Sequence, residues 1–339
     1  MKAKRSSYLF VTVSLLALLT VVMLIAGCTS NGTTATSSTP VPTAASSATS
    51  QAAAPAPAAA PAETATTAPA ASAAAGQTGT ITVSGSTTVQ PIAQDAADAF
   101  MKLNPGADIQ VSGGGSGVGI QAITAGSVNI GMSSVDLTAA QKAKIPNCVV
   151  TAVAQDGIAI IVNPANTIQY IAPSDIASIY EGKIVTWDQI PGAGVPGTNN
   201  QIVLVGRDTS SGTRTYFDQI IGDNGNPAKT MEQLNSNGAV EQAVASTPQA
   251  IGYVSIGFLS NTTKAVPLFY NNGAQIITPS AATVANHTYP YSRNLYMITQ
   301  GQPTGLTADY INFILSPAGQ QIVANDGYVP LPASSQTSS

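Results

Sequence analysis

Short β-branched runs alternate with helical runs from about residue 79 to residue 332, and this alternation constrains the fold more than any other feature. The first series has strand-like runs at Thr80–Ser84, Ala107–Val111 and Val128–Met132, separated by a helical run from Pro91 and another at Ser116–Ala125. A strand–helix–strand order needs a crossover connection, so the strands lie parallel and helices cover both faces of their sheet. The sequence therefore predicts an α/β fold.

A long apolar run, Val149–Val162, precedes a second series and is interrupted only at Gln155-Asp156-Gly157. It is typical of one long strand, or of two strands with a hinge between them. The second series predicts strands at Gln201–Val205, Ala250–Ser255 and Leu295–Thr299, and helices from a Ser174 cap, from Ser210, from Met231 to Ala245 and from Thr307 to Asn325. We expect the last helix to pack back on the first block, an expectation that rests partly on the family resemblance given below. Two α/β blocks joined by strands predict two lobes with a cleft between them and a hinge near Asp156 and before Leu295.

Residues 1–28 have the pattern of a secretory signal, because three basic residues precede a long apolar run that ends in Ile25-Ala26-Gly27-Cys28. That ending resembles the lipobox of bacterial lipoproteins, in which Cys28 would become the lipidated first residue. The run is also long enough to remain as an uncleaved membrane anchor. Residues 29–78 are nearly all Ala, Ser, Thr, Pro and Gly and predict a linker, and residues 333–339 predict a polar tail. In either case the folded part lies outside the cytoplasm, attached to the membrane.

Composition excludes several classes of function. Cys148 is the only cysteine after Cys28, so a hydrophobic core rather than an internal disulfide must stabilise the fold. Without the basic residues of the signal, nine basic residues face 16 acidic ones, a net charge of −7 that argues against nucleic-acid binding. His287 is the only histidine, so a multi-histidine metal site is impossible and little remains for a catalytic site. We expect no metal, no cofactor and no enzymatic activity.

Four segments at strand-to-helix joints are rich in Ser, Thr and Gly. They are GSTTVQP (Gly85–Pro91), GGGSGVG (Gly113–Gly119), GMSSVDL (Gly131–Leu137) and GRDTSSGTR (Gly206–Arg214). Ligands of open α/β sheets bind outside the carboxyl ends of the strands, where the free N–H groups of helix N-termini attract anions. Each segment alone could be an ordinary helix cap. Together they predict a binding site for one small tetrahedral oxyanion. A nucleotide is not expected, because no GxxxxGK[ST] loop is present and no acidic residue stands where a dinucleotide site needs one.

Two arginines and three aspartates accompany these segments. Arg207 ends a predicted strand, where its planar fork could pair with two oxygens of phosphate or sulfate. Arg214 lies one turn into the following helix and either contacts the ligand or pairs with an acidic neighbour. A carboxylate in the site would accept the proton that phosphate carries and repel sulfate, which carries none. Asp136, Asp156 and Asp208 are the candidates. We favour Asp156, because it interrupts an otherwise apolar strand.

The chain resembles the phosphate-binding solute receptors of phosphate ABC transporters. The segments GSTTVQP, GGGSGVGI, NIGMSS, DGIAIIVNP, IYEGKIVTWDQI, SSGTRTYF and GYVPL occur in the order of that family over nearly all of residues 79–332. The resemblance implies a two-lobed, type II-like periplasmic-binding-protein fold that closes on one phosphate. Lobe 1 would comprise residues 79–155 plus about 285–332, and lobe 2 residues 156 to about 284. The candidate phosphate-binding residues, including Asp156 from the argument above, are Ser86, Thr87, Thr88, Ser116, Ser134, Asp156, Arg207, Ser211, Gly212 and Thr213.

Two positions depart from some longer members of that family, which carry Asp in place of Ser134 and another Asp in place of Thr209. Shorter members often carry Ser at the first of these positions. The resemblance therefore implies an oxyanion ligand more firmly than it implies a choice between phosphate and sulfate.

The function that we predict is high-affinity phosphate binding outside the cytoplasm and delivery to the permease subunits of an ABC transporter. The receptor would be a lipid-anchored monomer on the outer face of the cell membrane. The alternatives are a receptor for sulfate, molybdate or tungstate, a surface phosphatase, and an adhesion or sensing protein that keeps the fold without transport.

Overall fold

The computed structural model describes residues 78–222, 225–270 and 275–332. The predicted signal peptide with Cys28, the linker up to residue 77 and the tail at 333–339 lie outside the described residues. Within the described ranges, no helix combines the length and the apolar character that a membrane span needs.

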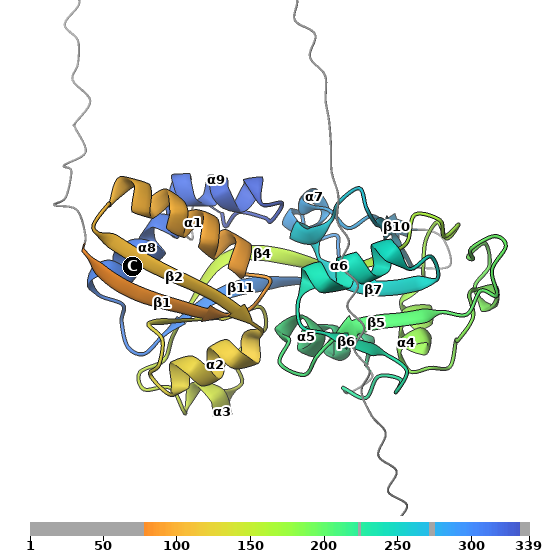
Figure 1. Ribbon diagram of the computed structural model, residues 1–339, viewed down its shortest axis with the longest axis horizontal. Coiled ribbons are helices and arrows are strands. Elements are labelled where there is room, and N and C mark those ends of the chain that lie inside the picture. The colour runs from red at the N-terminus through yellow and green to blue at the C-terminus, as the bar shows by residue number, and fades with distance from the viewer. Residues whose placement is uncertain (1–77, 223–224, 271–274, 333–339) are drawn as a thin grey trace, which may run out of the picture. The chain divides into compact units, whose positions relative to one another are not determined.

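Figure 1 shows the described elements gathered into two halves, with two strands running between them. The first half holds β1 (Gly79–Gly85), α1 (Gln90–Leu103), β2 (Ala107–Gly114), α2 (Ser116–Thr124), β3 (Ile130–Ser133), α3 (Ala139–Lys142), α8 (Gly305–Leu315) and α9 (Pro317–Asn325). The second half holds α4 (Pro173–Tyr180), β5 (Val203–Arg207), α5 (Gly212–Ile221), β6 (Glu232–Leu234), α6 (Asn237–Ser246), β7 (Ala250–Ser255), β8 (Lys264–Val266), β9 (Leu268–Tyr270), β10 (Gln275–Ile277) and α7 (Ala281–Ala285). Strands β4 (Val149–Val162) and β11 (Ser292–Thr299) connect the halves.

One curled sheet runs through both halves in the order β2-β1-β3-β11-β4-β7-β5-β6, with β8 paired beside β4. Strand β1 is parallel to β2 and β3, as the strand–helix alternation predicts. Strand β11 is antiparallel to both β3 and β4. The first part of β4 pairs with β11 and its last part, from Ile158 to Val162, pairs with β7. The apolar run at Val149–Val162 is therefore a single strand that serves both halves.

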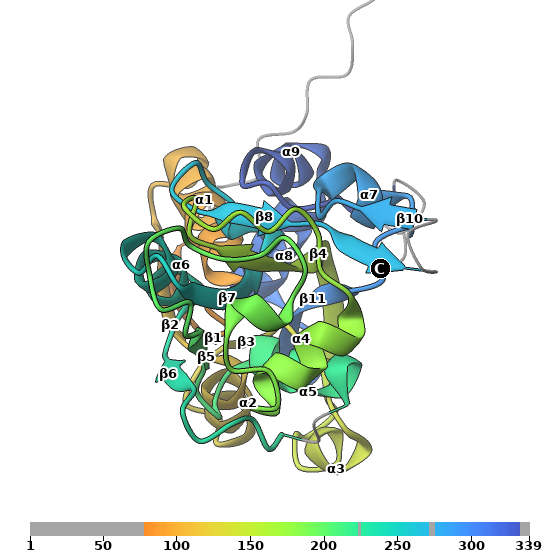
Figure 2. The same ribbon diagram turned by 90° about the vertical axis from the view of Figure 1, so that its right-hand side faces the viewer.

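Each half has its own hydrophobic core. In the first half, Phe100 and Met132 pack with Tyr310 of α8 and Val323 of α9, which confirms that the C-terminal helical segment returns to the first block. In the second half, Trp187 lies in a separate cluster with the stacked rings of Phe217 and Tyr253. Figure 2, which faces the second half, shows α4 and α5 close together. The buried hydrophobic residues of α4, α5 and α7 join this cluster, whereas those of α6 lie in another cluster. Two separately packed cores joined by two strands form bodies that can rotate against each other.

The second core also includes Val284, Tyr289 and Tyr291, which precede β11, whereas Leu295 and Met297 of β11 itself join the first core. The packing thus changes from one half to the other along the first residues of β11. Asp156 and Gly157 of β4 pair with Arg293 and Ser292 of β11 at this level.

Two predicted helices differ from the structure. The helix expected from Met231 to Ala245 is wrong at its start, because Glu232–Leu234 forms strand β6 beside β5 and the helix begins at Asn237 after a Ser236 cap. The helix expected from Thr307 to Asn325 is two helices, α8 and α9. Pro317 lacks the N–H group that a continuous helix needs, and Ser316 caps the second helix.

Helix starts elsewhere are shifted by one or two residues from the expected positions. Helix α5 begins at Gly212 and is capped by Ser211 rather than Ser210. Helix α4 begins at Pro173, before the expected Ser174 cap.

Candidate functional site

The four Ser/Thr/Gly-rich joints meet where the two halves touch. Gly117 at the start of α2 donates its N–H to the carbonyl oxygen of Ser210 at 2.9 Å, and the Ser210 hydroxyl donates to the carbonyl of Gly114 at 2.9 Å. Gly115, with φ of +98°, allows this approach, because a Cβ atom there would lie 2.5 Å from the Ser210 hydroxyl oxygen. The joint after β2 therefore lies directly against the joint after β5.

Small hydroxyl side chains line both sides of this contact. The Ser116 hydroxyl accepts the backbone N–H of Ser134 at 3.0 Å, and the Thr88 and Thr213 hydroxyls lie 3.0 Å apart, one from each half. All ten candidate residues named from the sequence are buried. On the first half lie Ser86, Thr87, Thr88, Ser116 and Ser134. On the second half lie Arg207, Ser211, Gly212 and Thr213, and Asp156 lies on β4.

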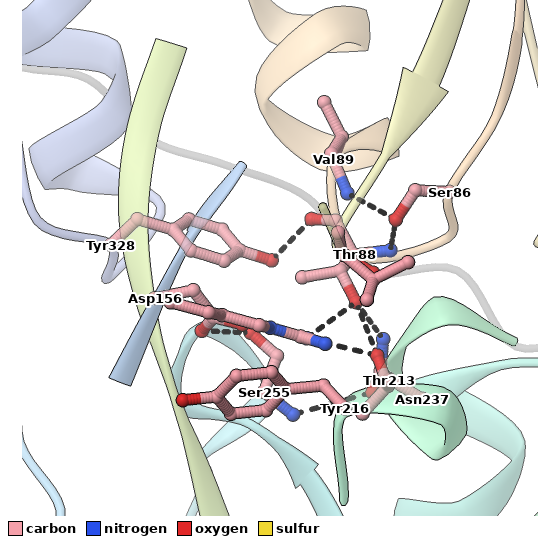
Figure 3. Close-up of polar contacts among 12 residues, drawn as sticks. Ser86, Thr88, Val89, Asp156, Thr213, Tyr216, Asn237, Ser255 and Tyr328 are labelled. Carbon is pink, nitrogen blue, oxygen red and sulfur yellow. Dashed lines mark hydrogen bonds and ion pairs between the residues drawn. The ribbon is translucent and has the colours of Figure 1, made fainter. Parts of the chain in front are cut away.

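The Ser86 side chain fixes the turn before α1, and the Ser211 side chain caps α5. The Ser86 hydroxyl accepts the N–H groups of Thr88 and Val89 at the start of α1, as Figure 3 shows. The Ser211 hydroxyl accepts the N–H of Arg214 in α5. The capping alternative thus describes the Ser211 side chain. The backbone N–H groups of Ser86 and Ser211 also have protein partners, the carbonyls of Met132 and Asp208 at 3.0 and 3.3 Å.

Arg207, the last residue of β5, is 1% exposed. Its Nε donates to the carbonyl of Leu234 at 3.1 Å and its Nη2 donates to the Thr87 hydroxyl at 3.0 Å, across the two halves. Its Nη1 is buried and has no hydrogen-bond partner. Within the described residues Arg207 has no carboxylate at ion-pair distance, unlike Arg214 and Arg293.

Burial lowers the pKa of Arg207 to about 10, and the nearby charge of Arg293 adds to that lowering. The guanidinium therefore stays charged near neutral pH. A buried cation with an unused donor and no paired carboxylate is costly unless an anion completes its environment. Arg207 is therefore a candidate partner for an anion.

A second buried guanidinium, Arg293 on β11, lies opposite Asp156 of β4. Its Nε and Nη2 both donate to Asp156 Oδ2, at 3.0 and 2.8 Å. The Ser255 hydroxyl donates to Asp156 Oδ1 at 2.6 Å. Burial raises the pKa of Asp156 above its ordinary value, while Arg293, Ser255 and the N–H of Ile256 act in the opposite direction.

The arrangement around Thr88 joins these parts. Its hydroxyl accepts from Asn237 Nδ2 at 3.0 Å and lies within 3.4 Å of Arg293 Nη2. Its carbonyl accepts the Tyr328 hydroxyl at 2.8 Å, and Figure 3 shows Thr88 between Tyr328 and the polar side chains of the second half. The start of α1 is therefore fixed from both the C-terminal segment and the opposite half.

The other charged candidates have local partners. Arg214 pairs with Asp218 at 3.3 Å and also donates to the carbonyl of Arg207. Asp208 accepts from the Ser210 hydroxyl at 2.7 Å, and Asp136 accepts from the Tyr296 hydroxyl. Arg214 thus pairs with an acidic neighbour, one of its two expected alternatives, and supports the backbone of Arg207.

Sequence reasoning missed Arg293, Asn237, Ser255 and Tyr328. Only three arginines follow Arg5, so a systematic look at each of them would have found Arg293. Its proximity to Asp156 depends on the pairing of two strands whose residues are 137 positions apart, which local patterns do not contain.

Known proteins resemble this chain over most of its folded part. A sequence model of the PBP superfamily domain matches residues 68–318. The phosphate-binding protein PstS of Bacillus subtilis is 34% identical over 255 residues, which cover 75% of this chain and 81% of that protein. A substrate-binding protein from Clostridium perfringens, solved with bound phosphate, has 29% identity and a TM-score of 0.68 over 75% of this chain and 100% of its own. An ABC-type phosphate transport receptor from Vibrio cholerae has 30% identity and a TM-score of 0.60 over 74% of this chain and 100% of its own.

Proposed function

Because the chain belongs to the PBP superfamily, and within it to the PstS family of phosphate-binding proteins, we propose that it binds inorganic phosphate between its two lobes for delivery to an ABC transporter. The two halves described above are the lobes of the periplasmic-binding-protein fold. The observation that carries the proposal for this chain is Arg207, a buried guanidinium with an unpartnered Nη1 at the contact between the lobes.

The surrounding groups suit an oxyanion. The first N–H groups of α1, α2 and α5 have no partner within their helices and carry a partial positive charge. Hydroxyls of Thr87, Thr88, Ser116, Ser134 and Thr213 are positioned beside them. We propose that Gly212 contributes its backbone N–H group, because it has no side chain to contribute. The N–H groups of Ser86 and Ser211 donate to the carbonyls of Met132 and Asp208, so we propose that these two residues shape the site rather than donate to the ligand.

We propose that the protein is a receptor and not an enzyme. The polar groups assembled between the lobes are hydroxyls, two guanidiniums and a carboxylate that already pairs with Arg293. Such a set holds an anion by hydrogen bonds and charge and requires no bond to be broken.

The remaining proposals concern the parts of the chain around the site. Residues 79–155 plus about 285–332 would form lobe 1, and residues 156 to about 284 lobe 2. The chain would act as a monomer outside the cytoplasm, anchored at Cys28. Treatment of cells with a signal-peptide inhibitor specific for lipoproteins should leave the uncleaved, heavier form if Cys28 is the lipidation site, and no mass change would contradict it.

Isothermal calorimetry tests the binding proposal. The full chain, purified in detergent and stripped of phosphate by denaturation and refolding, should bind inorganic phosphate with one site per chain. Sulfate at the same concentration should compete weakly. Absence of binding heat in a refolded sample with a cooperative melting curve would contradict the proposal, and tighter binding of sulfate would assign the site to another oxyanion.

A further inference from the structure

We infer that Arg293 is a second guanidinium ligand of the phosphate and that Asp156 is a positioning residue that holds Arg293 in place. The inference rests on the proposed function and adds the connecting strands β4 and β11 to the binding site. It goes beyond the joints at the strand ends, because Arg293 and Asp156 lie inside β11 and β4, the two strands that connect the lobes.

The orientation of Arg293 is restrained on several sides. Asp156 holds the edge formed by Nε and Nη2. The Tyr216 ring lies against the guanidinium, with its centroid 5.7 Å from Cζ. Nη2 also donates to the Thr213 hydroxyl of lobe 2 at 2.9 Å and reaches the Thr88 hydroxyl of lobe 1 at 3.4 Å. A guanidinium restrained in this way keeps its remaining nitrogen in one direction.

That remaining nitrogen, Nη1 of Arg293, is buried and has no hydrogen-bond partner. Nη1 of Arg207 is likewise buried and without a hydrogen-bond partner. The two side chains approach neighbouring hydroxyls at the start of α1, Arg207 at Thr87 and Arg293 at Thr88. Both guanidiniums thus reach the turn before α1, and each keeps one buried donor without a partner, which is what a tetrahedral anion with four oxygens can satisfy.

The charges support the same reading. Arg207 and Arg293 together carry two positive charges, and Asp156, which is fully buried, neutralises one of them. A net positive charge of one then remains where an anion would bind. Without Asp156 the two guanidiniums would repel each other in a poorly solvated site, which is costly.

Asp156 has no oxygen left for the ligand. Ser255 donates to Oδ1, Arg293 donates twice to Oδ2, and the N–H of Ile256 donates to the same carboxylate, so its roughly four acceptor positions are occupied. Asp156 therefore acts through Arg293 rather than by accepting the proton of the bound phosphate, the role that the sequence alone favoured for it.

A cycle of three variants of the full chain tests the inference by calorimetry with phosphate and with sulfate. Arg293→Gln should weaken phosphate binding by about 10- to 100-fold, the effect of losing hydrogen bonds to a charged group. The double variant Asp156→Asn with Arg293→Gln leaves no unpaired buried charge, and it should keep that loss. Asp156→Asn alone should change phosphate and sulfate affinity by the same factor. Lys144→Gln, which removes a positive charge from the exposed surface, is the control and should bind like the wild type.

Each contrary result has a separate meaning. Wild-type affinity in the double variant would show that Arg293 only neutralises Asp156 and would overturn the inference. A selective gain of sulfate affinity in Asp156→Asn would make Asp156 the acceptor of the phosphate proton and would overturn its positioning role. If the glutamine variants do not fold, Arg293→Lys keeps the ion pair but lacks the second nitrogen, and wild-type affinity there would also refute the inference. Failure of the wild type itself to bind phosphate would refute the proposed function instead, and the inference with it.

Discussion

Gly212→Ala should weaken phosphate binding without lowering the melting temperature of the unliganded protein. Gly212 begins α5 in lobe 2 and faces Ser116 of lobe 1. A methyl group there would lie 2.2 Å from the Ser116 hydroxyl oxygen and 2.9 Å from that of Ser134. Heavy atoms do not approach so closely, so either Ser116 moves or the lobes remain apart.

The expected cost follows from the bonds that Ser116 would lose. Its hydroxyl accepts the Ser134 N–H at 3.0 Å and lies 3.3 Å from the Ser134 hydroxyl. Two such bonds at about 1 kcal/mol each amount to about 2 kcal/mol, which weakens phosphate binding by about 30-fold. We expect the cost to fall on binding, because Gly212 belongs to one lobe and Ser116 to the other, and the proposed site lies between the lobes. Alanine is a better helix former than glycine, so the unliganded melting temperature should not fall.

Calorimetry with phosphate and melting curves without it measure the two effects separately. Gly238→Ala in α6 is the matched control, since its nearest neighbour is Phe258 Cε1 at 4.0 Å, and it should bind like the wild type. Gly212→Ala with an affinity within twofold of the wild type would refute the close contact. A melting temperature that falls without phosphate would show that the clash is present in the unliganded protein as well.

Two further predictions concern the support of α1. Burial and the neighbouring Asp95 raise the pKa of Asp326 to about 6, above its value in the unfolded chain. The protonated Asp326 carboxyl group contributes stability that is complete below about pH 4 and is lost as the pH rises through 6. Asp326→Asn should therefore stabilise the protein at pH 7.5 by about 1 kcal/mol, a figure that is reduced because Asp326 is partly exposed. The same variant should have no effect on stability at pH 4. Equal melting temperatures of the variant and the wild type at pH 7.5 would refute this prediction. Tyr328→Phe removes the donor to the buried carbonyl of Thr88 and should cost about 1–3 kcal/mol in urea unfolding, whereas an unchanged midpoint would mean that water replaces it.

The sequence predicts those parts of the fold and site that depend on local patterns. The parallel order of β1, β2 and β3 follows from strand–helix alternation, and Arg207 follows from its place at a strand end. The break at Pro317 was missed, although it depends on a local signal, because proline cannot continue a helix.

Features that depend on distant pairing were not predictable in the same way. Strand β6 has three residues and exists because it pairs with β5, so its local sequence favoured the helix that follows. Arg293 reaches Asp156 only through the register of β11 against β4. The role of Asp156 changed for this reason, since its partner is set by strand pairing and not by a motif.

A crystal structure of the full chain with phosphate is the most direct test of the central claim. We expect one phosphate between the lobes at the N-termini of α1, α2 and α5, with oxygens within about 3 Å of Nη1 of Arg207. A phosphate bound elsewhere, or a closed structure in which that nitrogen still has no oxygen beside it, would contradict the claim that Arg207 marks the anion site.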